Sequence, residues 1–457
     1  GRSFEVTNPS TGEVLAVLPD LGVVEARRAI AAAAAAQAAW ATRTGKARAA
    51  VLRKLYDLMM ANQDDLAAIM TAEQGKPLAE AKGEIAYGAS YVEWFGEEAK
   101  RVYGDVIPGH LEDKRIIVIK QPVGVVATIT PWNFPNSMLA RKMAPALAVG
   151  CAVVSKPAAE TPLSAIALAR LAERAGLPAG VFNVLPSRQS SQIGIEFCSN
   201  ETVRKVSFTG STEVGRILMR QAADQVKRLG LELGGNAPFI VFDDADLDAA
   251  VEGALVSKYR NNGQTCVCAN RLYVQAGVYD AFAEKLVAAT RRLKVGDGFT
   301  EGTTLGPLID ENAVAKVERH IADATGKGAR LLLGGHRQHG LFFEPTVLAG
   351  ATADMVLARE ETFGPVAPLF RFETIEEVIR LANATEFGLA SYFYARDLSR
   401  VFKVAEALDY GMVGINTGLI STEVAPFGGV KQSGHGREGS KYGADDYLDI
   451  KYLCLSV

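Results

Sequence analysis

The chain has 457 residues, of which 48% are apolar and 22% charged, and 49 basic against 52 acidic residues leave a net charge of −3. This balance and the lack of a long apolar run exclude a basic nucleic-acid footprint and a membrane-spanning segment. At about 150 residues per domain the length predicts roughly three domains. The 44 glycines are typical of an α/β protein with many tight turns.

The five cysteines are few, odd in number and scattered: Cys151, Cys198, Cys266, Cys268 and Cys454. This usage excludes a secreted disulfide framework and favours a cytoplasmic location, where thiols stay reduced. The first residue is Gly1, and the strand-like segment Phe4–Val6 follows almost at once. We therefore expect a further segment before Gly1 in the full-length protein.

Residues 21–103 are predicted to be mainly helical, because apolar side chains recur at helical spacing. This spacing predicts helices over Val24–Trp40, Lys46–Asn62 and Gln63–Glu73. The β-branched run Arg115–Lys120 then predicts a short strand.

From residue 123 onwards, predicted strands and helices alternate. The first series has helices at Ser137–Val149 and Pro162–Ala175 and strands at Val123–Thr130, Ala152–Ser155, Val181–Leu185, Val203–Phe208 and Val226–Glu232. The second begins with a strand at Phe239–Phe242 and continues with a helix at Asp246–Arg260 and a strand at Arg271–Val274. This alternation predicts an α/β fold with doubly wound parallel sheets. The alternating tail from Tyr447 must pair with a distant segment or with another chain.

One apparent nucleotide-binding motif fails on its context. Gly434–Gly439 matches G-x-G-x-x-G, but that motif needs a strand before it and a helix and an acid after it. Only 18 residues follow here, and a glycine-rich loop precedes it, so we reject it. The five histidines lie far apart, so no metal site is predicted.

Cys266 is a candidate nucleophile. It lies in the polar, glycine-containing stretch Asn261–Cys266, directly after a predicted helix. That setting suits an exposed reactive thiol, whereas a structural cysteine more often lies in an apolar run, as Cys151 does. Composition alone leaves both interpretations open.

Two further polar residues lie at or just after the carboxyl ends of predicted strands. Glu232 stands between two leucines, where burial would raise the pKa of its carboxyl towards the range of a general base, unless loop N–H groups satisfy it. Asn133 stands in a turn fixed by two prolines. Its amide could stabilise an oxyanion or cap the helix that begins near Ser137.

Six segments resemble, in order, the motif set of the aldehyde dehydrogenase superfamily. They are Pro131–Pro135, Phe208–Gly215, Leu231–Asn236, Gly263–Cys266, Glu361–Pro365 and Pro426–Gly429. Each motif alone is weak, but six in the family's order, spanning nearly the whole chain, are very specific. The resemblance implies two doubly wound parallel-sheet domains and a small β extension.

The resemblance also implies domain boundaries and a homo-oligomer. The dinucleotide-binding domain would comprise residues 1–103 and 123–233, and the catalytic domain residues 234–434. Residues 104–122 and 435–457 would form an oligomerisation extension, which gives the tail strand a partner. Copies would pair through it into a homodimer or homotetramer.

The chemistry implied is that of an NAD(P)-dependent aldehyde dehydrogenase. Cys266 would attack the aldehyde carbonyl, while the Asn133 amide and the Cys266 N–H hold the oxyanion. The nicotinamide would accept hydride from the thiohemiacetal. Glu232 would activate the water that hydrolyses the resulting thioester.

The implied cofactor-binding residues come from several of these motifs. They are Trp132, Lys156, Ala159, Gly210, Ser211, Gly215, Leu233, Glu361 and Phe363. Gly210–Gly215 would present a helix N-terminus to the pyrophosphate, and Lys156 and Glu361 would each meet one ribose.

NADP is the predicted cofactor, with NAD possible. Many NAD-dependent relatives carry a glutamate three residues after the lysine, where this chain has Ala159. A small neutral residue beside Lys156 leaves room for a 2′-phosphate. The acid is shifted to Glu160, and a modest turn could bring it back towards the ribose.

Within the superfamily, the segments Ala237–Asp246, Tyr259–Arg271 and Glu438–Gly443 resemble succinate-semialdehyde dehydrogenases most closely. A small-molecule aldehyde with a distal carboxylate needs cations near the nucleophile, and guanidinium groups bind carboxylates in a bidentate manner. The implied substrate-binding residues are Arg141, Arg260 and Ser421.

The predicted activity is therefore oxidation of succinate semialdehyde, the reaction of 4-aminobutyrate degradation. Two alternatives stay open: another ω-carboxy aldehyde such as glutarate semialdehyde, which one methylene distinguishes only weakly, or a non-catalytic protein on the same fold. Cys268 also has two interpretations, as a spectator or as the partner of Cys266 in a regulatory disulfide.

Overall fold

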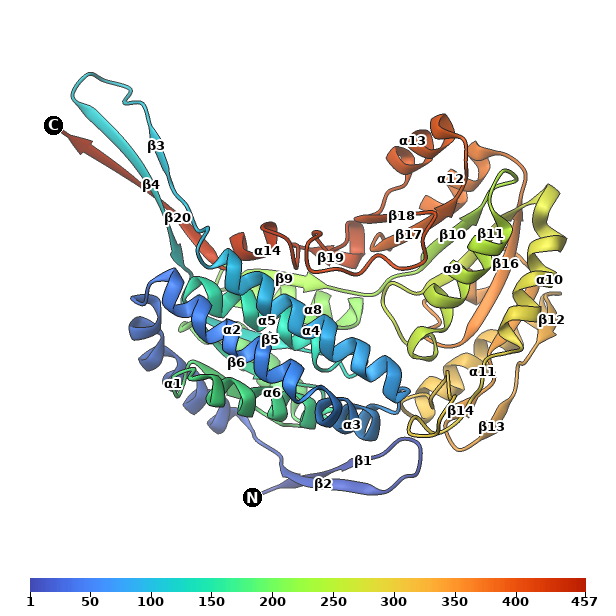
Figure 1. Cartoon of the computed structure of the whole chain (residues 1–457), viewed down its shortest axis with the longest axis horizontal. Helices are drawn as coiled ribbons and strands as arrows, with labels where there is room; N and C mark the ends of the chain where they lie inside the picture. The colour runs from blue at the N-terminus through green and yellow to red at the C-terminus, as the bar shows by residue number, and fades with distance from the viewer.

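The computed structural model describes residues 1–457, and Figure 1 shows two large α/β parts side by side with a thin β arm projecting from one of them. None of its helices combines the length and the apolar character that a membrane crossing requires.

The first part is built on a six-stranded sheet with the strand order β19-β9-β8-β5-β6-β7. Its strands are β5 (Val125–Ile129), β6 (Ala152–Lys156), β7 (Phe182–Val184), β8 (Val203–Thr209), β9 (Arg228–Glu232) and β19 (Gly434–His435). All are parallel except β19, which pairs antiparallel with β9. The glycine-rich segment rejected as a nucleotide motif therefore begins as an edge strand beside Glu232.

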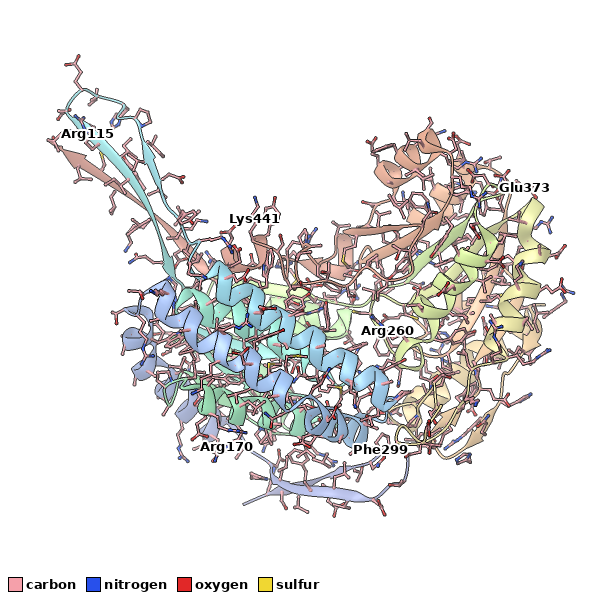
Figure 2. The ribbon with its side chains drawn as sticks, in the orientation of Figure 1. Arg115, Arg170, Arg260, Phe299, Glu373 and Lys441 are labelled. Atoms are coloured by element: carbon pink, nitrogen blue, oxygen red, sulfur yellow. The ribbon has the colours of Figure 1, made fainter.

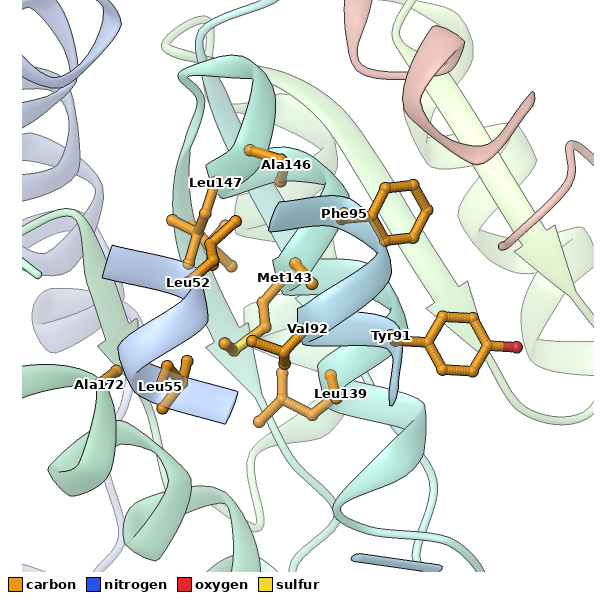
Figure 3. Close-up of a cluster of buried hydrophobic side chains, with 14 of the residues drawn as sticks. Leu52, Leu55, Tyr91, Val92, Phe95, Leu139, Met143, Ala146, Leu147 and Ala172 are labelled. Carbon is orange, nitrogen blue, oxygen red and sulfur yellow. The ribbon is translucent and has the colours of Figure 1, made fainter. Parts of the chain in front are cut away.

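Helices cover both faces of this sheet, as a doubly wound fold requires. One face carries α1 (Val23–Ala41), α7 (Ser190–Ser199) and α8 (Thr212–Ala223). The other carries α2 (Gly45–Ala61), α3 (Gln63–Gln74), α4 (Leu78–Glu98), α5 (Ser137–Val149) and α6 (Pro162–Ala175). Figure 3 shows the core between these helices, where Val92 of α4 lies beside Leu139 and Met143 of α5.

The second part is built on a seven-stranded sheet with the order β12-β15-β16-β11-β10-β17-β18, parallel except for β12. Its strands are β10 (Ala237–Val241), β11 (Ala269–Gln275), β12 (Arg330–Leu333), β15 (Thr346–Ala351), β16 (Val366–Phe372), β17 (Ala390–Tyr394) and β18 (Met412–Ile415). The helices α9 (Leu247–Tyr259) and α10 (Tyr279–Thr290) cover one face, and α11 (Glu311–Gly326), α12 (Ile375–Asn383) and α13 (Leu398–Ala407) cover the other.

The arm is a three-stranded antiparallel sheet of β3 (Asp105–Ile107), β4 (Lys114–Pro122) and β20 (Leu448–Ser456), in the order β20-β4-β3. The tail strand thus pairs with a distant segment, in register from Leu448 opposite Pro122 to Ser456 opposite Lys114. The smaller elements are the hairpin β1 (Ser3–Thr7) and β2 (Val14–Pro19), the pair β13 (Arg337–His339) and β14 (Phe342–Phe343), and the short helix α14 (Tyr442–Asp445).

The α/β class with doubly wound parallel sheets and a small β extension is confirmed. Element boundaries differ from the sequence predictions by one or two residues at most ends, because helix and strand ends depend on capping. The antiparallel edge strands β12 and β19 were not predicted, since nothing local in their sequences indicates a distant partner.

Candidate active site

Cys266 follows a strained turn that redirects the chain after α9. Asn261 and Asn262 have φ values of 51° and 56°, in the left-handed region that non-glycine residues rarely adopt. Gly263 follows with φ 74°, and a Cβ there would lie 2.2 Å from the carbonyl oxygen of Gly364, so only glycine fits. Such strain persists only where surrounding contacts enforce it. The Asn261 N–H donates to Glu80 (2.9 Å), and the Asn262 amide donates to the carbonyl oxygen of Gly306 (2.8 Å).

Asn133 is buried directly against this turn. Its side-chain amide donates to the carbonyl oxygen of Gln264, two residues before Cys266, at 3.1 Å. Because an amide has two N–H donors, one remains for an oxyanion. The alternative role as a helix cap does not fit, since α5 begins after Asn136, and Glu84 accepts the first N–H groups of that helix.

Glu232 ends β9, and its carboxyl is buried. Burial raises its pKa well above the ordinary value, and the nearby carboxylate of Glu438 raises it further, while Arg141 and Lys142 act in the opposite direction. One carboxyl oxygen, Oε2, has no hydrogen-bond partner. Burying a carboxyl oxygen without a hydrogen-bond partner costs folding free energy, which makes a functional role for it worth testing. This oxygen is available to a water or a proton.

Glu438 completes a buried charge cluster behind Glu232. It forms ion pairs with both Arg141 and Lys142. Burial acts to raise its pKa, but the two cations outweigh burial and hold the pKa of Glu438 below the ordinary value. The surroundings therefore favour the protonated form of Glu232 and the ionised form of Glu438.

The thiol of Cys266 is half-buried and neutral at rest. Burial raises its pKa to about 12, and the carboxylates of Glu361 and Glu232 also raise it, while Arg141 and Arg260 lower it. This resting thiol needs a base or a bound ligand before it becomes nucleophilic. Four of the predicted site residues, Arg141, Arg260, Glu232 and Glu361, are thus close enough to Cys266 to act on its pKa.

The two predicted substrate arginines differ in their surroundings. Arg141 is fully buried, pairs with Glu438 and packs over the ring of Phe427 at 4.3 Å, and its Nη2 has no hydrogen-bond partner. Arg260 is half-buried over the ring of Phe134 at 5.3 Å, and Figure 2 shows it between the two large parts. Arg141 is thus already neutralised in part by Glu438, while Arg260 forms no ion pair.

Ser421, the third predicted substrate residue, is half-buried in the loop after β18. The next residue, Thr422, accepts a hydrogen bond from the hydroxyl of Tyr91 (3.4 Å). Tyr91 in turn contacts the hydroxyl of Tyr87 at 2.8 Å, and both Arg141 and Arg260 act on the pKa of Tyr87. This tyrosine pair on α4 therefore links the Ser421 loop to the two arginines.

A cavity of about 1150 Å³ lies along the carboxyl ends of β5, β6 and β8. Of the predicted cofactor residues, it is lined by Trp132, Lys156, Ala159 and Gly210. Lys156 is only 4% exposed and has no hydrogen bond or ion pair with another side chain, and burial lowers its pKa. An unpaired buried ammonium in an open cavity fits an anionic ligand such as a dinucleotide.

The remaining predicted cofactor residues do not line that cavity. Ser211 caps α8 by accepting from the N–H of Val214 (3.3 Å), and a Cβ on Gly215 would lie 2.6 Å from Leu233, so glycine allows this helix to pack on the strand end. Glu361 accepts from the N–H of Gly235 (3.2 Å), and burial raises its pKa to about 7. Phe363 packs edge-on against Trp132 with ring centres 5.6 Å apart.

Cys268 is buried, and its thiol contacts the carbonyl oxygen of Lys258 at 3.3 Å. All five cysteines are free. A disulfide between Cys266 and Cys268 therefore stays a prediction, as does the spectator role.

Sequence reasoning missed several residues of this site, namely Lys76, Glu84, Tyr87, Lys142 and Glu438. One signal was available: Arg141 and Lys142 are adjacent in a helix that is buried along its whole length. Two cations in such a helix require a buried acid elsewhere in the chain.

Comparison with known proteins agrees with this geometry. The model of the aldehyde dehydrogenase family matches residues 1–453, and the chain belongs to that family. The glutarate-semialdehyde dehydrogenase of Pseudomonas putida is 66% identical over 457 residues, covering 100% of this chain and 95% of the relative. The succinate-semialdehyde dehydrogenase [NADP(+)] of Escherichia coli is 64% identical over 459 residues, with coverage of 100% and 95%. The crystal structure of succinate-semialdehyde dehydrogenase from Burkholderia pseudomallei matches with a TM-score of 0.99 at 66% identity, covering 100% of this chain and 95% of that one.

Proposed function

We propose that the protein oxidises succinate semialdehyde to succinate, with NADP as the hydride acceptor and NAD as a possible substitute. The observation that carries this proposal is the pair Arg141 and Arg260, which both act on the pKa of Cys266. Two guanidinium groups near one nucleophile suit a short aldehyde with a carboxylate at its other end. Two relatives named succinate-semialdehyde dehydrogenase, at 64% and 66% identity, support it.

The first half of the reaction takes place at Cys266. Its sulfur adds to the aldehyde carbon, and the Asn133 amide and the Cys266 N–H stabilise the oxyanion of the thiohemiacetal. Because the resting thiol is neutral, its proton must leave, and Glu232 is the nearby group that can receive it after releasing its own proton. Lys156, the N-terminus of α8 and Glu361 would hold NADP, which when bound would supply the hydride acceptor.

The second half is hydrolysis of the thioester on Cys266. Glu232, whose Oε2 lacks a partner, removes a proton from the attacking water, and the thiol then leaves as succinate forms. The buried cluster of Glu438, Arg141 and Lys142 sets the pKa of this base.

Glutarate semialdehyde is the second candidate substrate, favoured by the 66% identity to the Pseudomonas putida enzyme that carries its name. One added methylene changes binding by only about 1–3 kcal/mol, so one protein can accept both aldehydes. A non-catalytic protein on the same fold is the third interpretation, and the assay below distinguishes it.

The test is a kinetic series with aldehydes of increasing chain length and either cofactor, monitored as NADPH or NADH absorbance at 340 nm. We expect the highest kcat/KM for succinate semialdehyde with NADP. Arg260→Ala should raise KM for succinate semialdehyde by about 10–100-fold and leave KM for propanal within about twofold, because only the former has a carboxylate to lose. Equal effects on both aldehydes would refute carboxylate recognition, and no turnover of any aldehyde would favour the non-catalytic interpretation.

We further propose that the protein is a cytoplasmic homodimer or homotetramer that assembles through the arm. The five free cysteines fit a reducing compartment. The support for assembly is that β20 is an edge strand with exposed apolar side chains.

A further inference from the structure

His320 of α11 is a buried histidine that has no part in the proposed reaction. Its side chain is fully buried, and Nδ1 lies 3.1 Å from the hydroxyl oxygen of Thr362. Nε2 lies 3.3 Å from the carboxylate of Glu360, which also accepts from Arg319 at 2.6 Å. Because a hydroxyl can both donate and accept, the bond to Thr362 forms in either tautomer of the ring. The ring therefore contacts the residues on both sides of Glu361.

The segment that His320 contacts contains a strained residue. Phe363 has a φ of 54°, in the left-handed region that non-glycine residues rarely adopt. The next residue, Gly364, packs so closely on α11 that a Cβ there would lie 2.5 Å from Cγ2 of Val317. Val317 and His320 are three residues apart, so they lie on the same face of the helix. One face of α11 thus contacts the residues immediately before and after Phe363.

This strained segment lies between a predicted cofactor residue and the turn that precedes the nucleophile. Glu361 acts on the pKa of Cys266, which places its carboxyl at the reacting end of the site. On the other side, the carbonyl oxygen of Gly364 lies against Gly263 and leaves no space for a Cβ there. Strain of this kind persists only where surrounding contacts enforce it. The contacts from α11 are therefore what keeps Phe363 in its conformation.

His320 acts through hydrogen bonds rather than through charge. Burial lowers its pKa to about 4, and Lys316 and Arg319 of the same helix lower it further, while Glu360 acts in the opposite direction. The ring is therefore neutral at neutral pH. A neutral ring with a hydrogen-bond partner at each nitrogen has a fixed orientation, which suits a residue that positions its neighbours.

We propose that His320 is a positioning residue for the cofactor, because its bond to Thr362 holds the strained segment in the conformation that directs Glu361 at the ribose next to the nicotinamide. Without that bond, the backbone of Phe363 can leave the left-handed region, and Glu361 turns with it. The ribose hydroxyls would then lose their carboxylate acceptor. The adenosine half of the cofactor would keep its contacts, because Glu361 does not line the cavity beside Lys156. The inference rests on the proposed ribose-binding role of Glu361.

Binding measurements test this role without the aldehyde reaction. Calorimetric titrations of the full chain would use NADP or NAD, whichever binds the unmodified protein more tightly. The reference ligand is the matching adenosine half, adenosine 2′,5′-bisphosphate or AMP, which lacks the second ribose. His320→Leu should weaken binding of the dinucleotide by about tenfold and change the affinity for the adenosine half by less than about twofold. Thr362→Val removes the same bond from its other side and should reproduce this result.

Conservative variants separate positioning from a general loss of packing. The amide of His320→Asn can take the place of Nδ1 and should restore most of the dinucleotide affinity, whereas the amide of His320→Gln lies nearer Nε2 and should not. In a Glu361→Gln background, His320→Leu should have little further effect, because the carboxylate that it positions is gone. Ile321→Ala is the matched control, since Ile321 is also buried on α11 but forms no bond to Thr362. It should lower the urea midpoint and leave dinucleotide affinity unchanged.

Equal weakening of the dinucleotide and the adenosine half by His320→Leu would overturn the proposal, as would unchanged affinity for both. Full additivity of His320→Leu with Glu361→Gln, or a loss of dinucleotide affinity in Ile321→Ala as large as in His320→Leu, would also overturn it. If the unmodified protein binds neither dinucleotide, the proposed cofactor is wrong, and this role fails with it. Binding does not depend on which aldehyde is oxidised, so a failure here is distinct from a failure of the proposed substrate.

Discussion

Glu232 and Glu438 are two buried carboxyl groups whose pKa values are moved apart by their surroundings. Burial and Glu438 raise the pKa of Glu232, while Arg141 and Lys142 hold the pKa of Glu438 low. Pairs of titratable groups separated in this way are typical of acid–base sites. This arrangement favours the ionised form of Glu438, and Glu232 would act as the proposed base only after losing its proton.

Glu232→Gln removes the base and keeps the size of the side chain. We expect thioester hydrolysis to slow by about 10²–10⁴-fold, so that turnover becomes slow after one equivalent of NADPH. That first equivalent should itself form more slowly than in the unmodified protein, because Glu232 also receives the proton of Cys266. In the unmodified protein, hydrolysis should accelerate as pH rises, with an apparent pKa above the ordinary glutamate value of 4.5, because the active form is deprotonated.

Stopped-flow absorbance at 340 nm across a pH series measures both effects. In Glu232→Gln the pH dependence of hydrolysis should be lost. Steady turnover at the original rate without a burst would contradict the role of Glu232 as the hydrolytic base.

At the scale of elements, the loop after β5 is held by a buried ion pair from the segment between α3 and α4. Lys76 pairs with Glu84 and donates to the carbonyl oxygen of Asn133 at 2.7 Å. Glu84 also accepts from the N–H groups of Asn136 and Ser137, at the start of α5. The pair thus fixes both the predicted oxyanion residue and the helix that carries Arg141.

Lys76→Met should cost about 3–5 kcal/mol of unfolding free energy, because it leaves the buried carboxylate of Glu84 without its cation. It should also lower kcat, because Asn133 loses a contact that holds its backbone. Adding Glu84→Gln should restore part of the stability by removing the unpaired charge. Lys82→Met is the matched control, since Lys82 is exposed on α4, and its pair with Asp64 contributes at most about 1 kcal/mol.

Urea unfolding and steady-state kinetics of the four proteins test this prediction. Equal losses for Lys76→Met and Lys82→Met would contradict it.

Sequence patterns predicted the elements that are locally encoded. The parallel strands are short apolar runs, and Cys266, Glu232 and Asn133 each stand at or just after the end of a predicted helix or strand. The edge strand β19 and the ion pairs of Glu438 and Lys76 join residues 57 to 297 positions apart, and no local pattern indicates such partners. The raised pKa of Cys266 was missed for the same reason, because it depends on burial by distant segments.

At the scale of the whole molecule, the arm has an edge strand, β20, that no other strand of the chain covers on its outer side. Figure 1 shows the arm projecting away from both large parts, with β20 at one edge of its sheet. Ile450 and Tyr452 lie on one face of β20 and are 72% and 57% exposed. Native proteins rarely leave a long apolar edge strand in water, since it templates pairing with other chains.

The double substitution Ile450→Lys and Tyr452→Lys should therefore convert the proposed oligomer to a monomer. Two like charges on one face of an edge strand oppose its burial against another chain, while the pairing of β20 with β4 within the chain is retained. Light scattering after size-exclusion chromatography measures the mass. Val24→Lys is the control, because Val24 is comparably exposed, at 65%, but lies on α1. If the double variant keeps the mass of the unmodified protein, or if that protein is itself a monomer, assembly through β20 is wrong.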